Sequence, residues 1–204
     1  MFDKRKIIDL TKPVNSDLEI YYHGDYSDPE FSAETWCTVE SHGYWVSKLS
    51  FGTQTGTHID APAHFKSGAE TLEALPIERL MGPYFLVNLD DVHPDVPPSS
   101  LVEEFERQQI LFLKSSSGKS SLTPHQMDEL VSLEIPVWSV VGVVEIFEEP
   151  SLSFHRRLAE AGVYLIEDLH KQACHAVQAG GELIALPLRL QNVSGSPCRV
   201  LVVE

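Results

Sequence analysis

Residues 50–65, SFGTQTGTHIDAPAHF, constrain the fold of this chain more than any other stretch. They place four polar side chains at even spacings: Gln54, His58, Asp60 and His64. In extended backbone, residues of equal parity point to the same face, so we expect all four to face one cavity. The Cα atoms of His58 and Asp60 would lie roughly 7 Å apart, which lets both side chains reach one ion.

Imidazole and carboxylate groups together form the ligand set of zinc, manganese or iron, and zinc is the first choice. The alternative is a turn-rich loop whose polar residues cap neighbouring elements. That alternative explains Gly52, Gly56 and Pro62, which favour turns and interrupt helices and strands. It does not explain three ionisable groups within seven residues, so the stretch favours a metal site.

The length and charge of the chain restrict its class. We expect residues 1–204 to form one domain with a sizeable core, since 43% of the residues are hydrophobic and 22% are charged. The formal net charge of −15 disfavours a protein that binds nucleic-acid backbones. A small molecule is therefore the expected partner of the site.

The cysteines and the hydropathy of the chain indicate the cellular compartment in which the protein is expected. The three cysteines, Cys37, Cys174 and Cys198, lie far apart and form no CxxC pair, which favours neither a disulfide framework nor a thiolate zinc site. Residues 1–10 lack the apolar run of a signal peptide, and no run reaches the roughly 18 apolar residues of a membrane span. We therefore expect a cytoplasmic protein that does not enter a membrane.

Alternating and apolar patterns predict the strands, and capping signals predict the helices. The expected strands are residues 6–10, 36–42, 44–51, 84–89, 110–114, 137–147, 163–166, 183–190 and 199–203, with 36–42 and 44–51 forming a hairpin around Gly43. The expected helices are residues 100–108, 124–134, 153–161 and 170–178, and residues 71–81 form a short amphipathic segment. Residues 11–31 and 115–121 are expected loops. Strands that alternate with helices in the second half predict an α/β fold.

A second group of candidate ligands lies in residues 154–169, FHRRLAEAGVYLIEDL. His155 falls in the first turn of an expected helix, and Glu167 follows a short apolar strand. A helix–turn–strand unit folds back on itself, and α/β folds often place site residues beyond the strand ends. From these residues alone, a surface histidine and a solvated Glu-Asp pair are the favoured explanation of the pattern.

The sequence QTGTHIDAPAHF at residues 54–65 resembles the His-x-Gly-Thr-His-x-Asp-x-Pro-x-His signature of the kynurenine formamidase-like cyclase family of metal-dependent hydrolases. The resemblance extends over nearly the whole chain. It includes IDLT at residues 8–11, GD and DP within residues 24–29, LPIERL at 75–80, ALPLRL at 185–190 and the GSP turn at 195–197.

The resemblance implies a swivelling β/β/α fold with a mixed sheet, one or two divalent metal ions, and a homodimer or homotetramer. It implies that His58, Asp60, His155 and Glu167 are metal ligands, with Asp60 able to bridge two ions. His64 corresponds to the general acid/base. On this ground we interpret His155 and Glu167 as site residues.

This sequence departs from the family pattern at two places. Gln54 stands where the family has a histidine ligand, and an amide oxygen binds zinc poorly, so one metal position is expected to be weak, empty or occupied by manganese. Residues 140–145, VVGVVE, replace a segment that lies near the substrate in kynurenine formamidases. The resemblance therefore leaves the substrate open.

The expected chemistry is hydrolysis of a small amide C–N bond by metal-activated water. His64 would move the proton, because an imidazole can accept and return one near neutral pH. Arylformamidase activity, the conversion of N-formylkynurenine to kynurenine and formate, is the first hypothesis. The alternatives are an isatin-type cyclic amide or lactone hydrolase, and a metal-binding protein whose catalysis Gln54 has impaired. Residues 11–31, rich in tyrosine, are expected to cover the site or contact a partner subunit, and a surface loop with ordinary tyrosines is the alternative.

Overall fold

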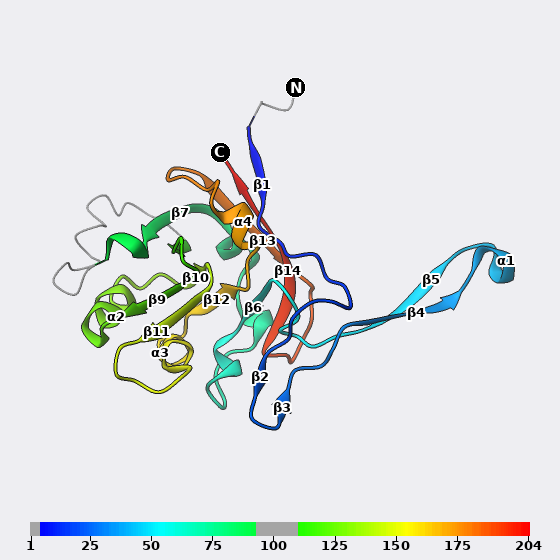
Figure 1. The fold of residues 1–204 in the computed structure, drawn as a ribbon, viewed down its shortest axis with the longest axis horizontal. Helices are drawn as coiled ribbons and strands as arrows, with labels where there is room; N and C mark the ends of the chain where they lie inside the picture. Colours follow the sequence, from blue (N-terminus) through cyan, green and yellow to red (C-terminus); the bar gives the residue numbers. More distant parts are fainter. Residues whose placement is uncertain (1–4, 93–109) are drawn as a thin grey trace.

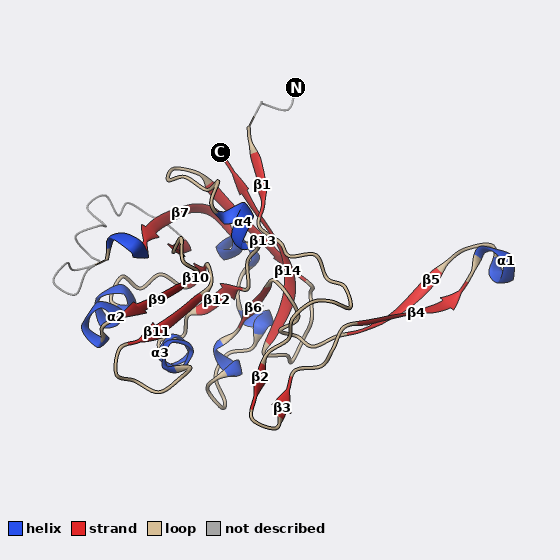
Figure 2. Ribbon diagram, viewed as in Figure 1, coloured by secondary structure: helices blue, strands red, loops and turns tan. Residues whose placement is uncertain are grey.

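A computed structural model gives the structure of residues 5–92 and 110–204, and its centre is a mixed sheet (Figure 1 and Figure 2). In sheet order its strands are β1 (Ile7–Asp9), β14 (Gly195–Val203), β13 (Glu182–Pro187), β7 (Met81–Asn88), β8 (Ile110–Lys114), β10 (Val137–Val140), β12 (Tyr164–Glu167) and β6 (His58–Asp60). Strand β6 also pairs with β14, so every strand of this sheet except β1 belongs to a closed barrel. The expected α/β fold with a mixed sheet is confirmed.

Half of the barrel is parallel, and this half explains the apolar runs in the sequence. Strands β7, β8, β10 and β12 pair in parallel, whereas β6, β13 and β14 pair with their neighbours in antiparallel fashion. Parallel strands covered on both faces need apolar residues at every position. In β8, Ile110 and Phe112 join the core inside the barrel, and Leu111 and Leu113 join a second core outside it.

The second core lies between the parallel strands and an outer layer. This layer consists of helices α2 (Pro124–Val131) and α3 (Ser153–Glu160) with a parallel strand pair, β9 (Lys119–Leu122) and β11 (Val143–Ile146). The start of α2 is fixed by the expected capping box, in which the side chains of Thr123 and Gln126 each bind the other's backbone N–H. Met127 of α2 and Phe154 of α3 are buried in this core.

Side-chain alternation on β6 and β12 directs the candidate ligands away from the barrel interior. Ile59 of β6 and Ile166 of β12 both belong to the interior core. Their neighbours in each strand point to the opposite face, so His58, Asp60 and Glu167 face the outer layer that contains α3. The expectation that His58 and Asp60 share one face is confirmed.

A long arm projects from the body of the molecule (Figure 1). It consists of β4 (Ser32–Cys37), the short helix α1 (Val39–His42) and β5 (Val46–Ser50), and the two strands pair in antiparallel fashion. The expected hairpin is confirmed, but its first strand ends at Cys37. Residues 39–42 form α1 instead of continuing the strand, because Thr38 caps a helical turn that Gly43 closes with a φ of 80°.

The remaining elements are short. They are β2 (Tyr22–His23), β3 (Tyr26–Ser27), α4 (Lys171–Cys174) and the 3-10 helices η1 (Pro62–His64), η2 (Leu72–Ala74), η3 (Ile77–Leu80) and η4 (Leu89–Asp91). Within the described ranges, no helix has both the length and the apolar character needed to cross a membrane.

The prediction of one strand over residues 137–147 is wrong. The segment forms two strands, β10 and β11, that belong to different sheets. Gly142 turns the chain between them with a φ of 78°, and a Cβ atom there would lie 2.1 Å from the carbonyl oxygen of Gly118. Only glycine permits both that conformation and that approach. The partner of β11 is β9, in a segment predicted to be a loop.

Five other predictions need smaller corrections. Residues 11–31 contain the β2–β3 pair, and residues 71–81 form η2 and η3. The helix expected over 170–178 is limited to α4, and the strand expected over 183–190 ends at Pro187. Strand β14 begins at Gly195, where the sequence predicts a turn, because residues 195–197 pair with β6. The helix expected over 100–108 lies outside the described residues.

Candidate metal centre

The pairing of β6 with β12 brings together side chains that are far apart in the sequence. In this antiparallel register His58 lies opposite Glu167, and Asp60 lies opposite Leu165. His58 Nε2 is 3.3 Å from Glu167 Oε1 and 3.6 Å from Asp60 Oδ1. Each of the three residues offers one ligand atom, and these atoms lie within 4.8 Å of one another. This spacing allows all three to contact one metal ion.

A backbone contact fixes the orientation of the His58 ring. Its Nδ1 lies 2.7 Å from the carbonyl oxygen of Gly56, which can only accept a hydrogen bond. Nδ1 is therefore the protonated nitrogen of the neutral ring, and the lone pair of Nε2 faces Asp60 and Glu167. This is the tautomer that a metal-binding histidine needs, and an outer hydrogen bond of this kind commonly orients such ligands.

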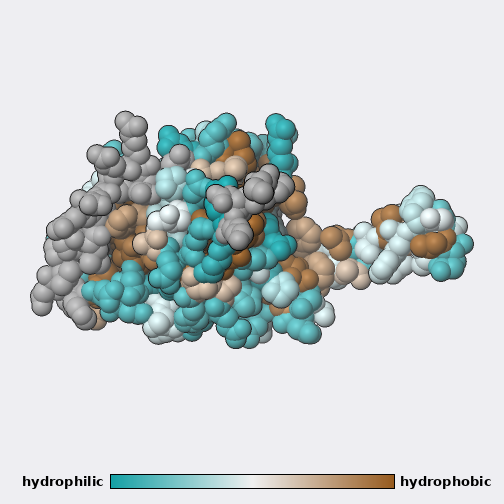
Figure 3. Space-filling view, turned by 90° about the horizontal axis from the view of Figure 1, so that it is seen from above, coloured by the Kyte–Doolittle hydropathy of each residue, from teal (hydrophilic) through white to brown (hydrophobic). Residues whose placement is uncertain are grey.

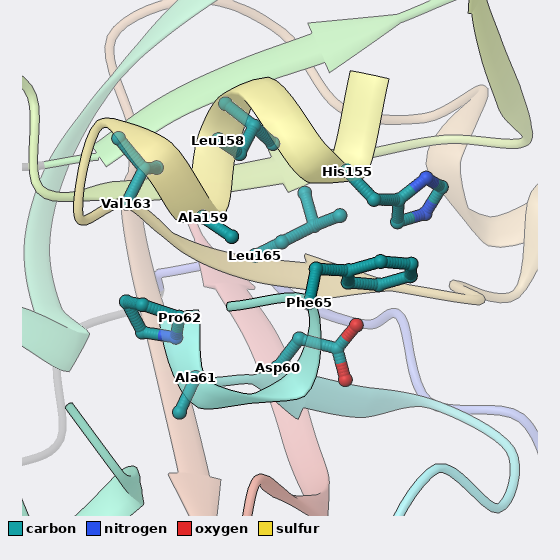
Figure 4. Close-up of a pocket in the computed structure, with 9 residues that line it drawn as sticks. All are labelled: Asp60, Ala61, Pro62, Phe65, His155, Leu158, Ala159, Val163 and Leu165. Atoms are coloured by element: carbon teal, nitrogen blue, oxygen red, sulfur yellow. The ribbon is translucent and has the colours of Figure 1, made fainter. Parts of the chain in front are cut away.

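His155 approaches the same cluster from helix α3. Its Nε2 lies 3.0 Å from Glu167 Oε2, so Glu167 contacts one histidine through each oxygen. Its Nδ1 is buried and has no hydrogen-bond partner. Figure 4 shows His155, Phe65 and Asp60 extending in the same direction, and the ring centroids of Phe65 and His155 are 5.1 Å apart. The structure thus brings His155 beside the candidate ligands of β6 and β12, as the resemblance implies.

His64 lies at the edge of the cluster, at the end of η1. Its Nε2 is 4.0 Å from Asp60 Oδ2, and its Nδ1 is 3.3 Å from the hydroxyl oxygen of Ser194. Its side chain is 31% exposed, compared with 7% for His58. His64 is therefore close to the candidate ligands yet accessible from solvent, which fits the expected role in proton transfer.

Gln54 also reaches the cluster, with its amide nitrogen turned inward. Gln54 Nε2 lies 3.3 Å from Asp60 Oδ1, while its Oε1 accepts a hydrogen bond of 2.6 Å from the Thr53 hydroxyl. In this arrangement Gln54 holds Asp60 in place and offers no oxygen to an ion. Binding of a metal ion through the amide oxygen of Gln54 stays a prediction, and it requires the side-chain amide to flip so that the oxygen faces Asp60.

Gly195 makes the close packing of this corner possible. A Cβ atom at residue 195 would lie 2.6 Å from Gln54 Nε2, 2.6 Å from the carbonyl oxygen of Ile59 and 3.2 Å from Asp60 Oδ1. Sequence reasoning overlooked both Gly195 and Ser194 as site residues. The GSP segment was the available signal, but only its pairing with β6 shows that the two residues border the cluster.

The segment 11–31 lies against the backbone that leads into the site. The backbone N–H of Lys12 donates to Thr57 Oγ1 at 2.9 Å. The space beside Gly56 is filled by Leu18 and Val14, whose side chains would lie 3.3 and 3.4 Å from a Cβ atom there. Part of the segment therefore supports the backbone at Gly56 and Thr57, which leads into the candidate metal centre. Its contact with a partner subunit stays a prediction.

The charges of the cluster strongly perturb its pKa values. Burial lowers the pKa of His58, but the bond to Glu167 and the charge of Asp60 outweigh this effect and raise it to about 9. Burial opposes ionisation of Glu167, yet the bonds from His155 and His58 hold its pKa well below the usual range. Burial raises the pKa of Asp60. The two buried carboxylates thus require nearby positive charge, which protons supply without a metal.

A small pocket lies behind Asp60 and His155 (Figure 4). Its other walls are apolar and consist of Ala61, Pro62, Phe65, Leu158, Ala159, Val163 and Leu165. Its volume of about 10 Å³ suffices for no more than a single water molecule. The pocket is therefore too small for an organic molecule, and His64 is a more exposed side chain at the edge of the cluster.

Comparisons with known proteins match nearly the whole length of this chain. The family described as putative cyclase matches residues 8–120. The kynurenine formamidase of Bacillus thuringiensis subsp. konkukian (strain 97-27) is 30% identical over 208 residues, which cover 96% of this chain and 96% of that protein.

Two solved structures share the fold of this chain. Isatin hydrolase A from Labrenzia aggregata, bound to benzyl benzoate, matches with a TM-score of 0.79 and 19% identity, covering 98% of this chain and 93% of that one. A predicted metal-dependent hydrolase from Bacillus stearothermophilus matches with a TM-score of 0.70 and 22% identity, covering 98% of this chain and 99% of that one. These likenesses confirm the fold that the sequence resemblance implies.

Proposed function

This chain belongs to the cyclase family of metal-dependent hydrolases, and we propose that it hydrolyses the C–N bond of a small aryl formamide. N-formylkynurenine is the substrate we propose first, since a kynurenine formamidase is 30% identical over nearly the full chain. One observation carries the proposal. His58 Nε2 faces the carboxylates of Asp60 and Glu167, with the more exposed His64 beside them.

The donor set fits a divalent metal ion. His58, Asp60 and Glu167 would hold it, and His155 would complete the set, because its Nε2 already lies beside Glu167. Two imidazoles and two carboxylates suit zinc first and manganese second, with one or two ions per chain. When bound, such an ion polarises the substrate carbonyl and lowers the pKa of a coordinated water toward about 7.

The protein side chains perform the remaining steps. His64 accepts the proton of the attacking water and returns it to the leaving aryl amine, which cannot depart as an anion. The Ser194 hydroxyl at His64 Nδ1 orients the ring so that Nε2 faces Asp60 and the reacting groups. Phe65 forms an apolar wall beside Asp60 and His155.

Hydrolysis of a cyclic amide or a lactone is the second candidate. It uses the same groups, since the C–N or C–O bond of a ring opens by the same attack on a carbonyl. The isatin hydrolase likeness supports it only through the shared fold. Residues 140–145 differ from the segment expected near the substrate in kynurenine formamidases. This difference is a reason to keep a cyclic amide or a lactone as a candidate substrate. A metal-binding protein that does not catalyse a reaction is the third candidate, because Gln54 stands where the family has a histidine ligand.

A substrate panel separates these candidates. The metal-loaded chain is assayed with N-formylkynurenine, with isatin and with a simple aryl lactone, each beside the His64→Ala variant. Turnover of N-formylkynurenine that is fastest by kcat/KM and depends on His64 supports the first proposal. Preference for isatin or the lactone supports the second. Bound metal without turnover of any compound supports the third.

A further inference from the structure

The pairing of β6 with β12 stops at the two residues that carry candidate ligands. His58 is the first residue of β6, and it lies opposite Glu167, the last residue of β12. Beyond this pair a side chain makes the next contact, because the Thr57 hydroxyl donates to the backbone carbonyl oxygen of Asp168 at 2.8 Å. One hydroxyl therefore joins the residue before His58 to the residue after Glu167.

The N-terminal segment orients this hydroxyl. The backbone N–H of Lys12 donates to Thr57 Oγ1 at 2.9 Å. An N–H group can only donate, so it occupies a lone pair of the hydroxyl oxygen and leaves the hydroxyl proton for the carbonyl oxygen of Asp168. Thr57 is only 2% exposed, so water competes little with either hydrogen bond.

Asp168 needs such support because its backbone lies in the left-handed region. Its φ is 56°, a conformation that few residues other than glycine adopt, although aspartate and asparagine tolerate it better than most. Residues in this region persist where the surrounding contacts determine their conformation. The turn at Asp168 sets the direction in which the chain leaves Glu167, so a change there would move the end of β12.

A second contact at the same turn is weaker. The Lys12 ammonium group pairs with the Asp168 carboxylate, and the two side chains are 32% and 36% exposed. Figure 3 shows that hydrophilic residues cover much of the body on the face in view. Ion pairs between exposed side chains contribute little to stability, since water and salt screen them. The buried hydroxyl of Thr57 is therefore the main constraint on the turn.

We propose that Thr57 is a positioning residue of the candidate metal centre. Its hydroxyl holds the turn at Asp168 so that Glu167 stays beside His58. The inference rests on the proposed metal-dependent function and adds a residue that supports the ligands from outside the cluster. Glu167 contacts His58 through one carboxylate oxygen and His155 through the other, at 3.3 and 3.0 Å. A small shift of its backbone would alter both contacts, and outer groups that hold ligands in place typically raise metal affinity about 10–100-fold.

Titration with cobalt(II) measures this role without an activity assay. Cobalt binds the ligand types that hold zinc, and its visible absorption changes with the number and arrangement of its ligands. Thr57→Val removes the hydroxyl but keeps a branched side chain of similar size. In this variant the affinity of the metal-free chain for cobalt should fall about 10–100-fold, and the spectrum of the bound ion should change. Thr57→Ser keeps a hydroxyl and should restore both.

Thr11→Val is the matched control. The Thr11 hydroxyl also donates one hydrogen bond and accepts one, to the carbonyl oxygen of Val200 at 3.3 Å and from its N–H at 2.9 Å. Val200 lies outside residues 195–197, the part of β14 that pairs with β6. Urea denaturation of Thr11→Val should therefore show a loss of stability like that of Thr57→Val, while its cobalt affinity and spectrum stay unchanged.

Two substitutions at Asp168 test the same turn even if Thr57→Val does not fold. Asp168→Asn and Asp168→Val both remove the ion pair with Lys12, but only valine strongly disfavours the left-handed region. Asp168→Val should therefore bind cobalt less tightly than Asp168→Asn. Because the side chain of Asp168 is partly exposed, we expect both variants to fold.

Three results would overturn the proposal while leaving the metal centre intact. The first is a folded Thr57→Val variant that binds cobalt with the affinity and spectrum of the natural chain. The second is an equal loss of affinity in Thr11→Val, which would assign the effect to general stability. The third is equal affinity in Asp168→Val and Asp168→Asn. A natural chain that binds no cobalt would instead refute the metal centre of the proposed function, and the role of Thr57 with it.

Discussion

His58 and Glu167 face each other across the antiparallel pair β6–β12, with His58 Nε2 3.3 Å from Glu167 Oε1. This pairing joins the sequence motif at residues 54–65 to a carboxylate more than a hundred residues later. Ile59 of β6 and Ile166 of β12 point into the barrel, so His58 and Glu167 must point to the opposite face. The candidate metal centre is thus a consequence of strand register.

The first prediction concerns metal binding. His58→Ala and Asp60→Ala should each lower the bound metal to near zero and abolish activity, since both groups belong to the cluster that would hold the ion. Elemental analysis of the purified variants measures this. His125→Ala, on an exposed face of α2, is the control and should keep its metal. Full occupancy in either site variant would show that the assigned ligand is wrong.

The second prediction separates proton transfer from metal binding. His64→Ala should keep its metal but lose about 10²–10⁴-fold in kcat, the usual contribution of a general acid/base. Ser194→Ala, which removes the partner of Nδ1, should cause a smaller loss with the metal content unchanged. Stopped assays with metal analysis on the same samples test both. Loss of metal from the His64→Ala variant would show that His64 is a metal ligand and would contradict its role in proton transfer alone.

The third prediction follows from the raised pKa of His58, about 9 in the metal-free protein. A histidine whose pKa is higher in the folded state than its ordinary value near 6.5 stabilises the fold fully below pH 6.5 and loses that contribution as pH rises toward 9. The contribution is at most about 3 kcal/mol. Urea denaturation of the chelated chain should therefore show stability falling from pH 6.5 to 9.

Metal binding should show the opposite trend with pH. A metal ion needs the neutral ring of His58, so its binding releases a proton and its affinity rises between pH 6.5 and 9. In His58→Gln the pH dependence of stability should flatten. An unchanged slope in that variant would assign the effect to other groups.

The fourth prediction concerns Gln54. Its oxygen is bound by Thr53, and its nitrogen faces Asp60, so a second ion beside residue 54 lacks a strong ligand. Calorimetric titration of the metal-free chain should show one tight ion and a second that is weak or missing. Gln54→His should strengthen the weak position. Two equally tight ions in the natural chain would contradict this account.

Local sequence patterns predicted one half of the site. Even spacing in an extended backbone was enough to predict that His58 and Asp60 share one face, because the alternation of side chains along a strand is a local property. His155 and Glu167 belong to a helix and a strand whose contact depends on tertiary packing. The residues alone therefore favoured surface positions for both, and only the family resemblance indicated that they belong to the site. Ser194 was missed because only the pairing of β14 with β6 places it beside His64.

The errors in the fold have the same origin. The apolar pattern of residues 137–147 predicts one strand. Only the close approach of Gly142 to Gly118 shows that the chain turns at Gly142. The serine-rich segment that contains β9 has weak strand propensity and forms a strand because β11 pairs with it. In both cases a tertiary contact overrides the local preference.

The central claim is that His58, Asp60 and Glu167 hold a metal ion beside His64. An anomalous difference map from crystals of the metal-loaded chain, collected at the absorption edge of the added metal, tests it most directly. The account predicts a peak within about 2.0–2.3 Å of His58 Nε2 and of an oxygen from each of Asp60 and Glu167. A peak elsewhere, or none at this cluster in a chain that elemental analysis shows to be loaded, would contradict it.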